Sequence, residues 1–134
     1  MKKAVYPGSF DPVTLGHLNI IKRAHQLVET LVVAVGVNPR KEYLFSRDER
    51  VAMIEEALAK QTGIEVKPLT GLLADFMAAE DTNLIIRGLR ATSDFEKEFK
   101  RDALNKKLDS DLETVILMAE GKYNYLSSSA VKEV

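Results

Sequence analysis

Residues 3–37 read KAVYPGSFDPVTLGHLNIIKRAHQLVETLVVAVGV, and the spacing of their apolar side chains changes twice. The runs Lys3–Tyr6 and Leu31–Val37 are rich in β-formers, and the second is apolar nearly throughout, which is typical of a strand buried on both faces of a parallel sheet. The segment His17–Glu29 between them has helical spacing instead, and one face would carry Leu18, Ile21, Ala24 and Val28. A strand, a helix and a second strand in this order predict an α/β fold with a right-handed crossover.

The same alternation continues to the end of the chain. Three more strands are expected at Ile64–Leu69, Asn83–Ile86 and Thr114–Met118, and three more helices at Arg47–Lys60, Leu72–Ala79 and Asp94–Leu108. Two capping boxes, Ser46-x-x-Glu49 and Ser93-x-x-Glu96, mark helix starts, and Ser127–Ser129 would begin a last helix. We therefore expect one Rossmann-like domain over residues 1–134, with a five-stranded parallel sheet in the order 3-2-1-4-5 and helices on both faces.

The composition narrows the class of protein. With 134 residues and 46% hydrophobic residues, the chain can bury a core, which argues against a disordered protein. The net charge of −1 gives no basic field, so we expect no nucleic-acid partner. The absence of cysteine excludes disulfides and thiolate chemistry. No apolar run could span a membrane, and the N-terminus lacks the pattern of a signal peptide, so we expect a soluble cytoplasmic protein.

Groups that suit a phosphate follow four of the five predicted strands. They are Gly8–Asp11, Asn38–Lys41, Arg87–Arg90 and Tyr123–Ser129, which offer close backbone approach, cationic side chains and a serine-rich helix start. Since ligands of such sheets bind beyond the carboxyl ends of the strands, Gly8, His17, Arg90 and Ser128 should meet at one cleft. Neither G-x-x-x-x-G-K-[ST] nor G-x-G-x-x-G occurs, which argues against a P-loop kinase and a dinucleotide dehydrogenase.

The tetrapeptide Thr14-Leu15-Gly16-His17 is the most specific of these signals. Thr14 can cap the helix, and a neutral His17 in the first turn can donate one N–H to a phosphate oxygen. Each candidate also has a purely structural alternative. His17 could be a surface or capping residue, Lys41 an ordinary loop lysine, and Arg87 or Arg90 an ion-pair partner of Asp94, Glu96 or Glu98. The residues alone thus indicate a nucleotide- or phosphate-handling α/β domain, in which cationic side chains and N–H donors hold the phosphates electrostatically.

Three segments together resemble the bacterial phosphopantetheine adenylyltransferases. They are YPGSFDPVTLGH at 6–17, IRGLRA at 86–91 followed by Asp94-Phe95-Glu96, and YLSSSAVKEV at 125–134. The resemblance implies transfer of the adenylyl group of ATP to 4′-phosphopantetheine, giving dephospho-coenzyme A and pyrophosphate without a covalent intermediate. It also implies Mg²⁺ bound mainly through the ATP phosphates, coenzyme A or its dephospho form as a ligand, and a homohexamer with contacts near residues 72–79 and 94–108. Members of this family usually continue beyond this chain's last residue, so the family's C-terminal tail is expected to be missing.

The resemblance also implies a role for each matching residue. His17 would stabilise the transition state at the ATP phosphates. Ser9, Lys41, Leu73 and Arg87 would bind phosphopantetheine. ATP would contact Ser9, Phe10, His17, Gly88, Leu89, Arg90, Glu98, Tyr123, Asn124, Tyr125, Leu126, Ser127, Ser128 and Ser129. Two alternatives stay open: a cytidylyltransferase of the same superfamily, which would want a histidine in place of Thr14, and a non-catalytic nucleotide-binding or assembly module.

Overall fold

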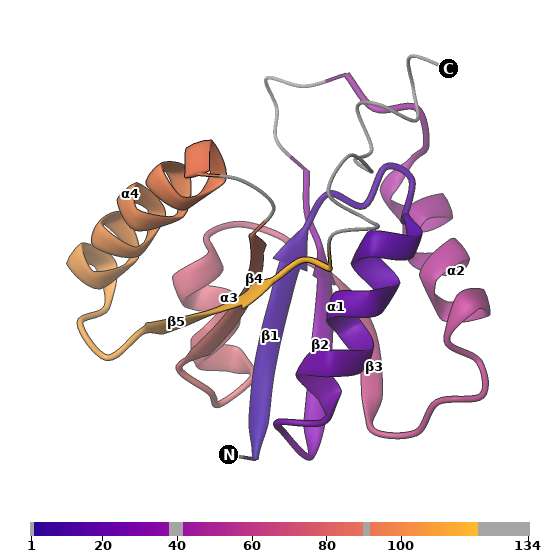
Figure 1. Ribbon diagram of the computed structural model, residues 1–134, viewed down its shortest axis with the longest axis horizontal. Helices are drawn as coiled ribbons and strands as arrows, with labels where there is room; N and C mark the ends of the chain where they lie inside the picture. Colours follow the sequence, from indigo (N-terminus) through magenta and orange to yellow (C-terminus); the bar gives the residue numbers. More distant parts are fainter. Residues whose placement is uncertain (1, 38–41, 90–91, 121–134) are drawn as a thin grey trace.

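The computed structural model describes residues 2–37, 42–89 and 92–120, and strands alternate with helices throughout them (Figure 1). The elements are β1 (Lys3–Gly8), α1 (Leu15–His25), β2 (Thr30–Val35), α2 (Arg47–Ala57), β3 (Ile64–Pro68), α3 (Leu73–Ala79), β4 (Leu84–Leu89), α4 (Thr92–Leu108) and β5 (Glu113–Met118). All nine had been expected from the sequence, with differences of a few residues at their ends. The expected helix after Ser127 lies outside the described residues.

The five strands form one parallel sheet in the order β3-β2-β1-β4-β5. The predicted fold class and strand order are therefore confirmed. β1 lies in the middle, with Val5 opposite Val32 of β2 on one side and opposite Ile85 of β4 on the other. The chain leaves β1 toward one edge and later returns to its other side, so the topological switch point lies between β1 and β4.

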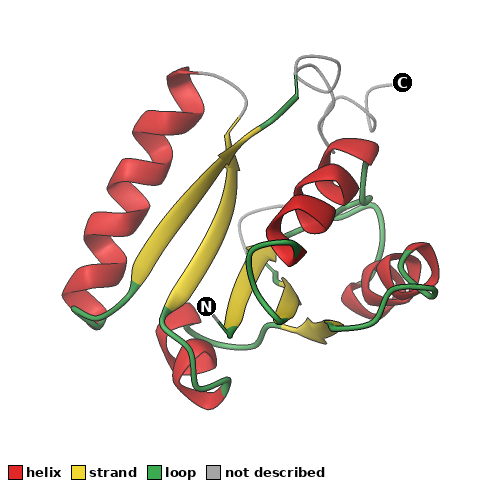
Figure 2. Ribbon diagram, turned by 60° about the horizontal axis from the view of Figure 1, so that its bottom comes forward, coloured by secondary structure: helices red, strands yellow, loops and turns green. Residues whose placement is uncertain are grey.

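Helices lie on both sides of the sheet (Figure 2), and an apolar cluster on each face attaches them to it. On one face, Ile21 of α1 and Ile54 of α2 pack on side chains of β1 and β2, and all of these are buried. On the other face, Met77 of α3 packs with Val5 and Ile85. The helices thus cover both faces, as the sequence predicted. No helix within the described ranges is long and apolar enough to cross a membrane.

The structure confirms two of the three helix starts predicted from capping residues, and shows that the third prediction is wrong. Thr14 is the N-cap of α1, and Ser46 forms the expected capping box with Glu49 at the start of α2. The capping box expected at Ser93 is wrong, because α4 already begins at Thr92 and Ser93 therefore lies inside the helix. A Ser-x-x-Glu pattern marks a start only where the chain upstream leaves the helical conformation.

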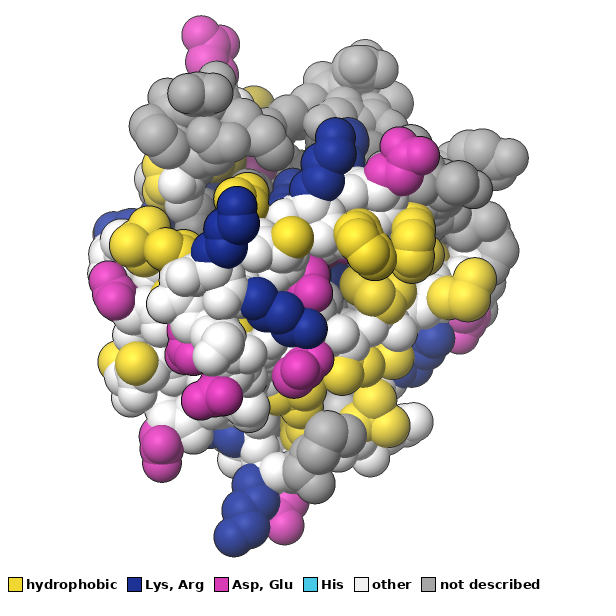
Figure 3. Space-filling model, turned by 90° about the vertical axis from the view of Figure 1, so that its left-hand side faces the viewer, with side chains coloured by type: hydrophobic (Ala, Val, Ile, Leu, Met, Phe, Trp, Pro, Cys, Tyr) yellow, Lys and Arg dark blue, Asp and Glu magenta, His cyan; other side chains and the backbone are white. Residues whose placement is uncertain are grey.

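Helix α4 departs from the usual amphipathic pattern. Among the side chains that the structure describes on α4, at residues 95–108, Glu98 is the buried one. Four large apolar side chains there are exposed, each by about half or more: Phe95, Phe99, Leu104 and Leu108. Figure 3 looks at the molecule from the side of α4 and shows hydrophobic side chains gathered there between charged ones. A helix in a monomer usually turns its apolar side inward, so the outward apolar groups of α4 fit an interaction surface.

Candidate functional site

The predicted site residues that the structure describes lie at or just after the carboxyl ends of the strands, or on the helices that follow them. They are Ser9, Phe10, His17, Leu73, Arg87, Gly88, Leu89 and Glu98. The other predicted site residues lie outside the described ranges: Lys41, Arg90, Tyr123, Asn124, Tyr125, Leu126, Ser127, Ser128 and Ser129. Of the four groups expected to meet at one cleft, Gly8 and His17 are therefore the two whose positions can be compared, and Phe10 contacts both of them.

Phe10 is the centre of the loop after β1. A Cβ added to Gly8 would lie 2.9 Å from the Phe10 ring, so the ring needs a glycine beneath it. The Phe10 ring meets Tyr6 edge-to-face at 5.2 Å between centroids and His17 in the same way at 4.9 Å. Phe10 has a φ of 50°, in the left-handed region, which costs a bulky residue about 1–3 kcal/mol. With only 3% of its surface exposed, Phe10 is held in this conformation by packing.

His17 completes a capping box in which an imidazole takes the usual place of a glutamate. The Thr14 side chain accepts from the His17 backbone N–H at 3.3 Å, and the Thr14 backbone N–H donates to Nδ1 of His17 at 3.0 Å. A backbone N–H can only donate, so Nδ1 must carry a lone pair. The proton of the neutral ring is therefore on Nε2. The fold selects the tautomer that presents an N–H donor at Nε2, with Nδ1 turned to the backbone.

The start of α1 adds further donors near His17. Leu15 and Gly16 are the first two residues of the helix, and their N–H groups have no acceptor inside it. The helix dipole places partial positive charge at the same end. Backbone amides, the dipole and the Nε2–H of His17 together make this end of α1 suitable for binding an anion.

Arg87 lies in β4 and reaches across to the end of β1. Its Nη1 donates to the Pro7 carbonyl at 3.1 Å, and its Nε lies 3.4 Å from Oε2 of Glu98. The ion-pair alternative weighed for Arg87 is thus present, with Glu98 as the partner. Burial lowers the pKa of Arg87 and outweighs the Glu98 carboxylate, which acts to raise it. The guanidinium is therefore a partly desolvated cation, which strengthens its attraction to an anion.

Glu98 joins two arginines and still has an unsatisfied oxygen. It also pairs with Arg101, one turn later on α4. Its Oε2 is buried and accepts no hydrogen bond from a described residue, although it faces the Arg87 guanidinium. A buried carboxylate oxygen in this state can accept a hydrogen bond from a ligand hydroxyl or amine.

Of the remaining predicted residues, Gly88 and Leu73 have packing roles. Gly88 lies against α1, where an added Cβ would come within 3.2 Å of Ile20. Leu73 begins α3 and packs partly buried against the apolar cluster on the second face of the sheet. Leu89 ends β4. Gly88 thus allows close contact between β4 and the helix that carries His17.

Two buried polar residues join the loops at this edge, and the sequence reasoning missed both. Asp11 is 1% exposed, and its carboxylate accepts from the backbone N–H groups of Leu44 at 2.7 Å and Phe45 at 2.9 Å. Arg50, also 1% exposed, lies on the buried side of α2 in line with Ile54. The available signal was the spacing of Arg50 and Ile54, because a charged residue one helical turn before a core isoleucine lies on the same buried face.

The end of β5 is tied to α1 as well. Nη1 of Arg23 donates to the Met118 carbonyl at 2.7 Å, and the Asn19 amide donates to Glu120 at 3.1 Å. The last described residue before the predicted ATP-binding segment 123–129 is therefore fixed to the helix of His17.

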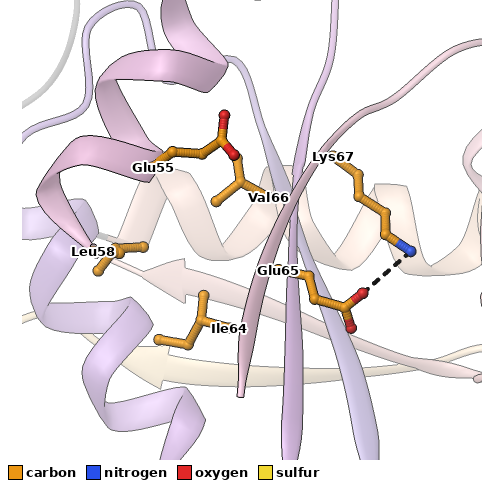
Figure 4. A pocket seen from close by; sticks show the side chains of 6 residues that line it. All are labelled: Glu55, Leu58, Ile64, Glu65, Val66 and Lys67. Carbon is orange, nitrogen blue, oxygen red and sulfur yellow. Dashed lines mark ion pairs between the residues drawn. The ribbon is translucent and has the colours of Figure 1, made fainter. Parts of the chain in front are cut away.

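A separate hollow lies beside β3, away from these residues (Figure 4). It is lined by Glu55 and Leu58 from α2 or just after it and by Ile64, Glu65, Val66 and Lys67 from β3. The Glu65 carboxylate pairs with Lys67 at 3.4 Å across its rim. None of the predicted site residues that the structure describes lines this hollow.

The structure also bears on how a metal could bind. Within the described ranges, no three His, Cys, Asp or Glu side chains are grouped as metal ligands. The Asp11 carboxylate accepts from two backbone amides, and the Glu98 carboxylate lies beside the cationic side chains of Arg87 and Arg101. A divalent cation at either carboxylate would have to compete with these amide and guanidinium groups.

Comparisons with known proteins agree on one superfamily. Residues 5–134 match the model of the cytidylyltransferase-like family. A phosphopantetheine adenylyltransferase of Clostridium botulinum is 58% identical over the whole chain, which covers 82% of that protein. The enzyme of the same name from Clostridium tetani is 52% identical, and the chain covers 84% of it.

Two solved structures share the fold. A lipopolysaccharide core biosynthesis protein of Thermoplasma volcanium superposes with a TM-score of 0.63 at 23% identity, covering 90% of this chain and 97% of that one. A pantoate-beta-alanine ligase of Francisella tularensis superposes with a TM-score of 0.68 at 14% identity, covering 98% and 65%. At these identities the likeness supports the Rossmann-like architecture alone.

Proposed function

The chain belongs to the phosphopantetheine adenylyltransferase family of nucleotidyltransferases, and on this premise we propose that it transfers the adenylyl group of ATP to 4′-phosphopantetheine. The products are dephospho-coenzyme A and pyrophosphate. The observation that carries the proposal is the fixed tautomer of His17, whose Nδ1 accepts the Thr14 N–H at 3.0 Å. This tautomer provides a neutral N–H donor at an anion-binding helix end, without requiring a protonated ring.

In the proposed reaction, an oxygen of the 4′-phosphate attacks the α-phosphorus of ATP. One P–O bond forms to the acceptor, the P–O bond to the β-phosphate breaks, and pyrophosphate leaves with the electron pair. The attacking phosphate is already anionic, so no general base is needed. His17 would donate its Nε2–H to an α-phosphate oxygen as charge develops there, and this contact would be strongest in the transition state.

The remaining residues would bind and align the two substrates. Ser9, Lys41, Leu73 and Arg87 would hold phosphopantetheine, and the partly desolvated Arg87 supports an anionic group in this place. Ser9, Phe10, Gly88, Leu89, Arg90, Glu98 and residues 123–129 would bind ATP. The unsatisfied Oε2 of Glu98 supports a contact with a donor group of the nucleotide.

Mg²⁺ would be bound mainly by the ATP phosphates: among the described residues, the buried Asp11 already accepts from two backbone amides, and the buried Glu98 lies beside two arginines whose charge repels a cation. When bound, the ion supplies charge neutralisation on the triphosphate. The chain's own contribution is the set of donors at the start of α1 and the arginine of β4.

We also propose that the enzyme is a cytoplasmic homohexamer that contacts its copies through α3 and α4. The exposed apolar side chains of α4, with Phe99 at 67% exposure and Phe95 at 49%, support burial of this helix in an interface. Light scattering at micromolar concentration should give a mass several times that of one chain. A strict monomer would refute the proposed assembly, but it would not contradict the proposed reaction.

The reaction itself is tested by release of pyrophosphate from ATP or CTP in the presence of 4′-phosphopantetheine. We expect release with ATP and magnesium, dependent on the acceptor, and little release with CTP. Preference for CTP would favour the cytidylyltransferase alternative. ATP binding without any release would favour a non-catalytic nucleotide-binding module.

A further inference from the structure

Arg50 is a buried cation whose guanidinium donates to backbone carbonyl oxygens and lies over an aromatic ring. Its Nη1 donates to the Ser9 carbonyl at 2.7 Å and to the Gly36 carbonyl at 2.8 Å. Its Nε lies 3.2 Å from the Phe45 carbonyl and 3.3 Å from that of Ser46, and the guanidinium lies 4.3 Å from the centroid of the Tyr43 ring. No carboxylate of the described residues forms an ion pair with Arg50.

These bonds join three separate pieces of backbone at the carboxyl edge. Ser9 follows β1, Gly36 follows β2, and Phe45 precedes α2. The two hydrogens of one nitrogen serve the first two pieces, and the Nε–H serves the third. A planar guanidinium can reach all three at once, whereas the compact ammonium of a lysine cannot.

The bond to the Ser9 carbonyl fixes the peptide that leads into Phe10. Phe10 has the left-handed φ of 50°, so a loosened Ser9–Phe10 peptide would let this residue relax to an ordinary conformation. The Phe10 ring contacts His17 at 4.9 Å between centroids. Movement of Phe10 would therefore change the surroundings of the His17 imidazole as well as the position of the Ser9 hydroxyl.

We propose that Arg50 is a positioning residue for adenylyl transfer, which aligns Ser9 directly and His17 through Phe10. Because Arg50 is 1% exposed and its donors are directed at backbone carbonyls, it would act through Ser9 and Phe10 and not on a substrate directly. The expected loss of kcat rests on the proposed function. The expected effect of Arg50 on the positions of Ser9, Phe10 and His17 does not depend on that function. Small displacements of aligned groups cost rate far more than they cost ground-state binding.

The experiment compares Arg50→Lys and Arg50→Met with Arg47→Met. Arg47 is a matched control, because it lies on the same helix and donates to one carbonyl, that of Leu69 at 3.4 Å, but reaches neither the β1 nor the β2 loop. Circular dichroism first establishes a temperature at which each variant is folded. Steady-state kinetics at that temperature then separate kcat from both KM values, and NMR records the imidazole resonances of His17 without substrate.

We expect both Arg50 variants to lose about tenfold or more in kcat per folded enzyme, with smaller changes in KM, and to shift the His17 resonances. Arg47→Met should keep kcat within about twofold. A folded Arg50→Lys with the kcat and His17 resonances of the wild type would overturn the proposal, and so would a purely structural loss, with a lower melting temperature and normal kcat. If Arg50→Met unfolds, the lysine variant decides alone. A wild type without transferase activity would refute the function, while the NMR comparison would still test the positioning.

Discussion

Replacing His17 separates its structural role from its proposed catalytic role. In His17→Ala, the Thr14 backbone N–H loses its acceptor at 3.0 Å, which costs about 1 kcal/mol by the usual worth of a helix cap. The edge-to-face contact with Phe10 is lost too, at about 1 kcal/mol. The free energy of unfolding of the variant should therefore be about 2 kcal/mol lower than that of the wild type.

The catalytic loss should be larger than this destabilisation. Removing one donor that acts on developing charge costs roughly 3 kcal/mol of transition-state stabilisation, or about a hundredfold in kcat. The affinity for ATP should change much less, because the contact is proposed to strengthen only during transfer. The assay is steady-state kinetics with both substrates varied, together with ATP titration of the variant.

His17→Glu is the matched control, since a glutamate three residues after a threonine N-cap makes an ordinary capping box. Its carboxylate can accept the Thr14 N–H, so about half of the lost stability should return in a thermal melt. It has no donor for a phosphate oxygen, so kcat should stay at least about a hundredfold low. If His17→Ala kept its kcat and merely bound ATP less well, His17 would be a binding residue and the reasoning would be refuted.

Three further outcomes are expected. Gly8→Ala should cost about 1–3 kcal/mol of stability in denaturant unfolding, because its Cβ would lie 2.9 Å from the Phe10 ring; unchanged stability would mean that the ring moves freely. Lys41→Ala should mainly raise the KM for phosphopantetheine in initial-rate kinetics, and a loss confined to kcat would contradict its proposed role. Burial acts to raise the pKa of Glu80, but the hydrogen bonds that it accepts from Lys67 and Lys3 outweigh burial, so the pKa is lowered. The same hydrogen bond with Glu80 raises the pKa of Lys67. Their stabilisation should thus be complete between pH 4.5 and 10.5, the ordinary values, and be lost as the pH falls through the folded pKa of Glu80 or rises through that of Lys67. Melting curves of Glu80→Gln and wild type should therefore differ most within this range and converge in acid.

The strands and their order were predictable because each depends on a pattern of many residues. The apolar run from Leu31 to Val35 can be buried on both faces only inside a parallel sheet, and the handedness of crossovers then leaves few arrangements. The helix ends were less predictable. The helical spacing of Val51, Ile54 and Leu58 also predicts Ala57 on the buried face of α2. Ala57, the last residue of the helix, is exposed, and Arg50 is buried together with Ile54.

The parts of the site that escaped prediction depend on single bonds to backbone atoms. Arg50 donates to backbone carbonyl oxygens, which every residue has, so no pattern of side chains in the sequence predicts these partners. Likewise His17 was recognisable as a residue of the first helical turn, but a histidine as the accepting member of a capping box falls outside the usual Ser/Thr-x-x-Glu/Gln pattern. The left-handed φ of Phe10 follows from packing against Tyr6 and His17, which becomes evident only after folding.

The central place of β1 in the sheet also has a consequence for the order of folding during synthesis. β1 finds β2 early, since Val5 pairs with Val32, but its other edge waits for Ile85. Until the ribosome has released β4, the apolar strand at the future centre of the sheet is an open edge, which is a template for pairing with another nascent chain. Closing the long loop between β1 and β4 also adds to the entropic barrier of the last step. Slow translation between β3 and β4 should therefore lower the yield of soluble protein more than an equal pause after β5.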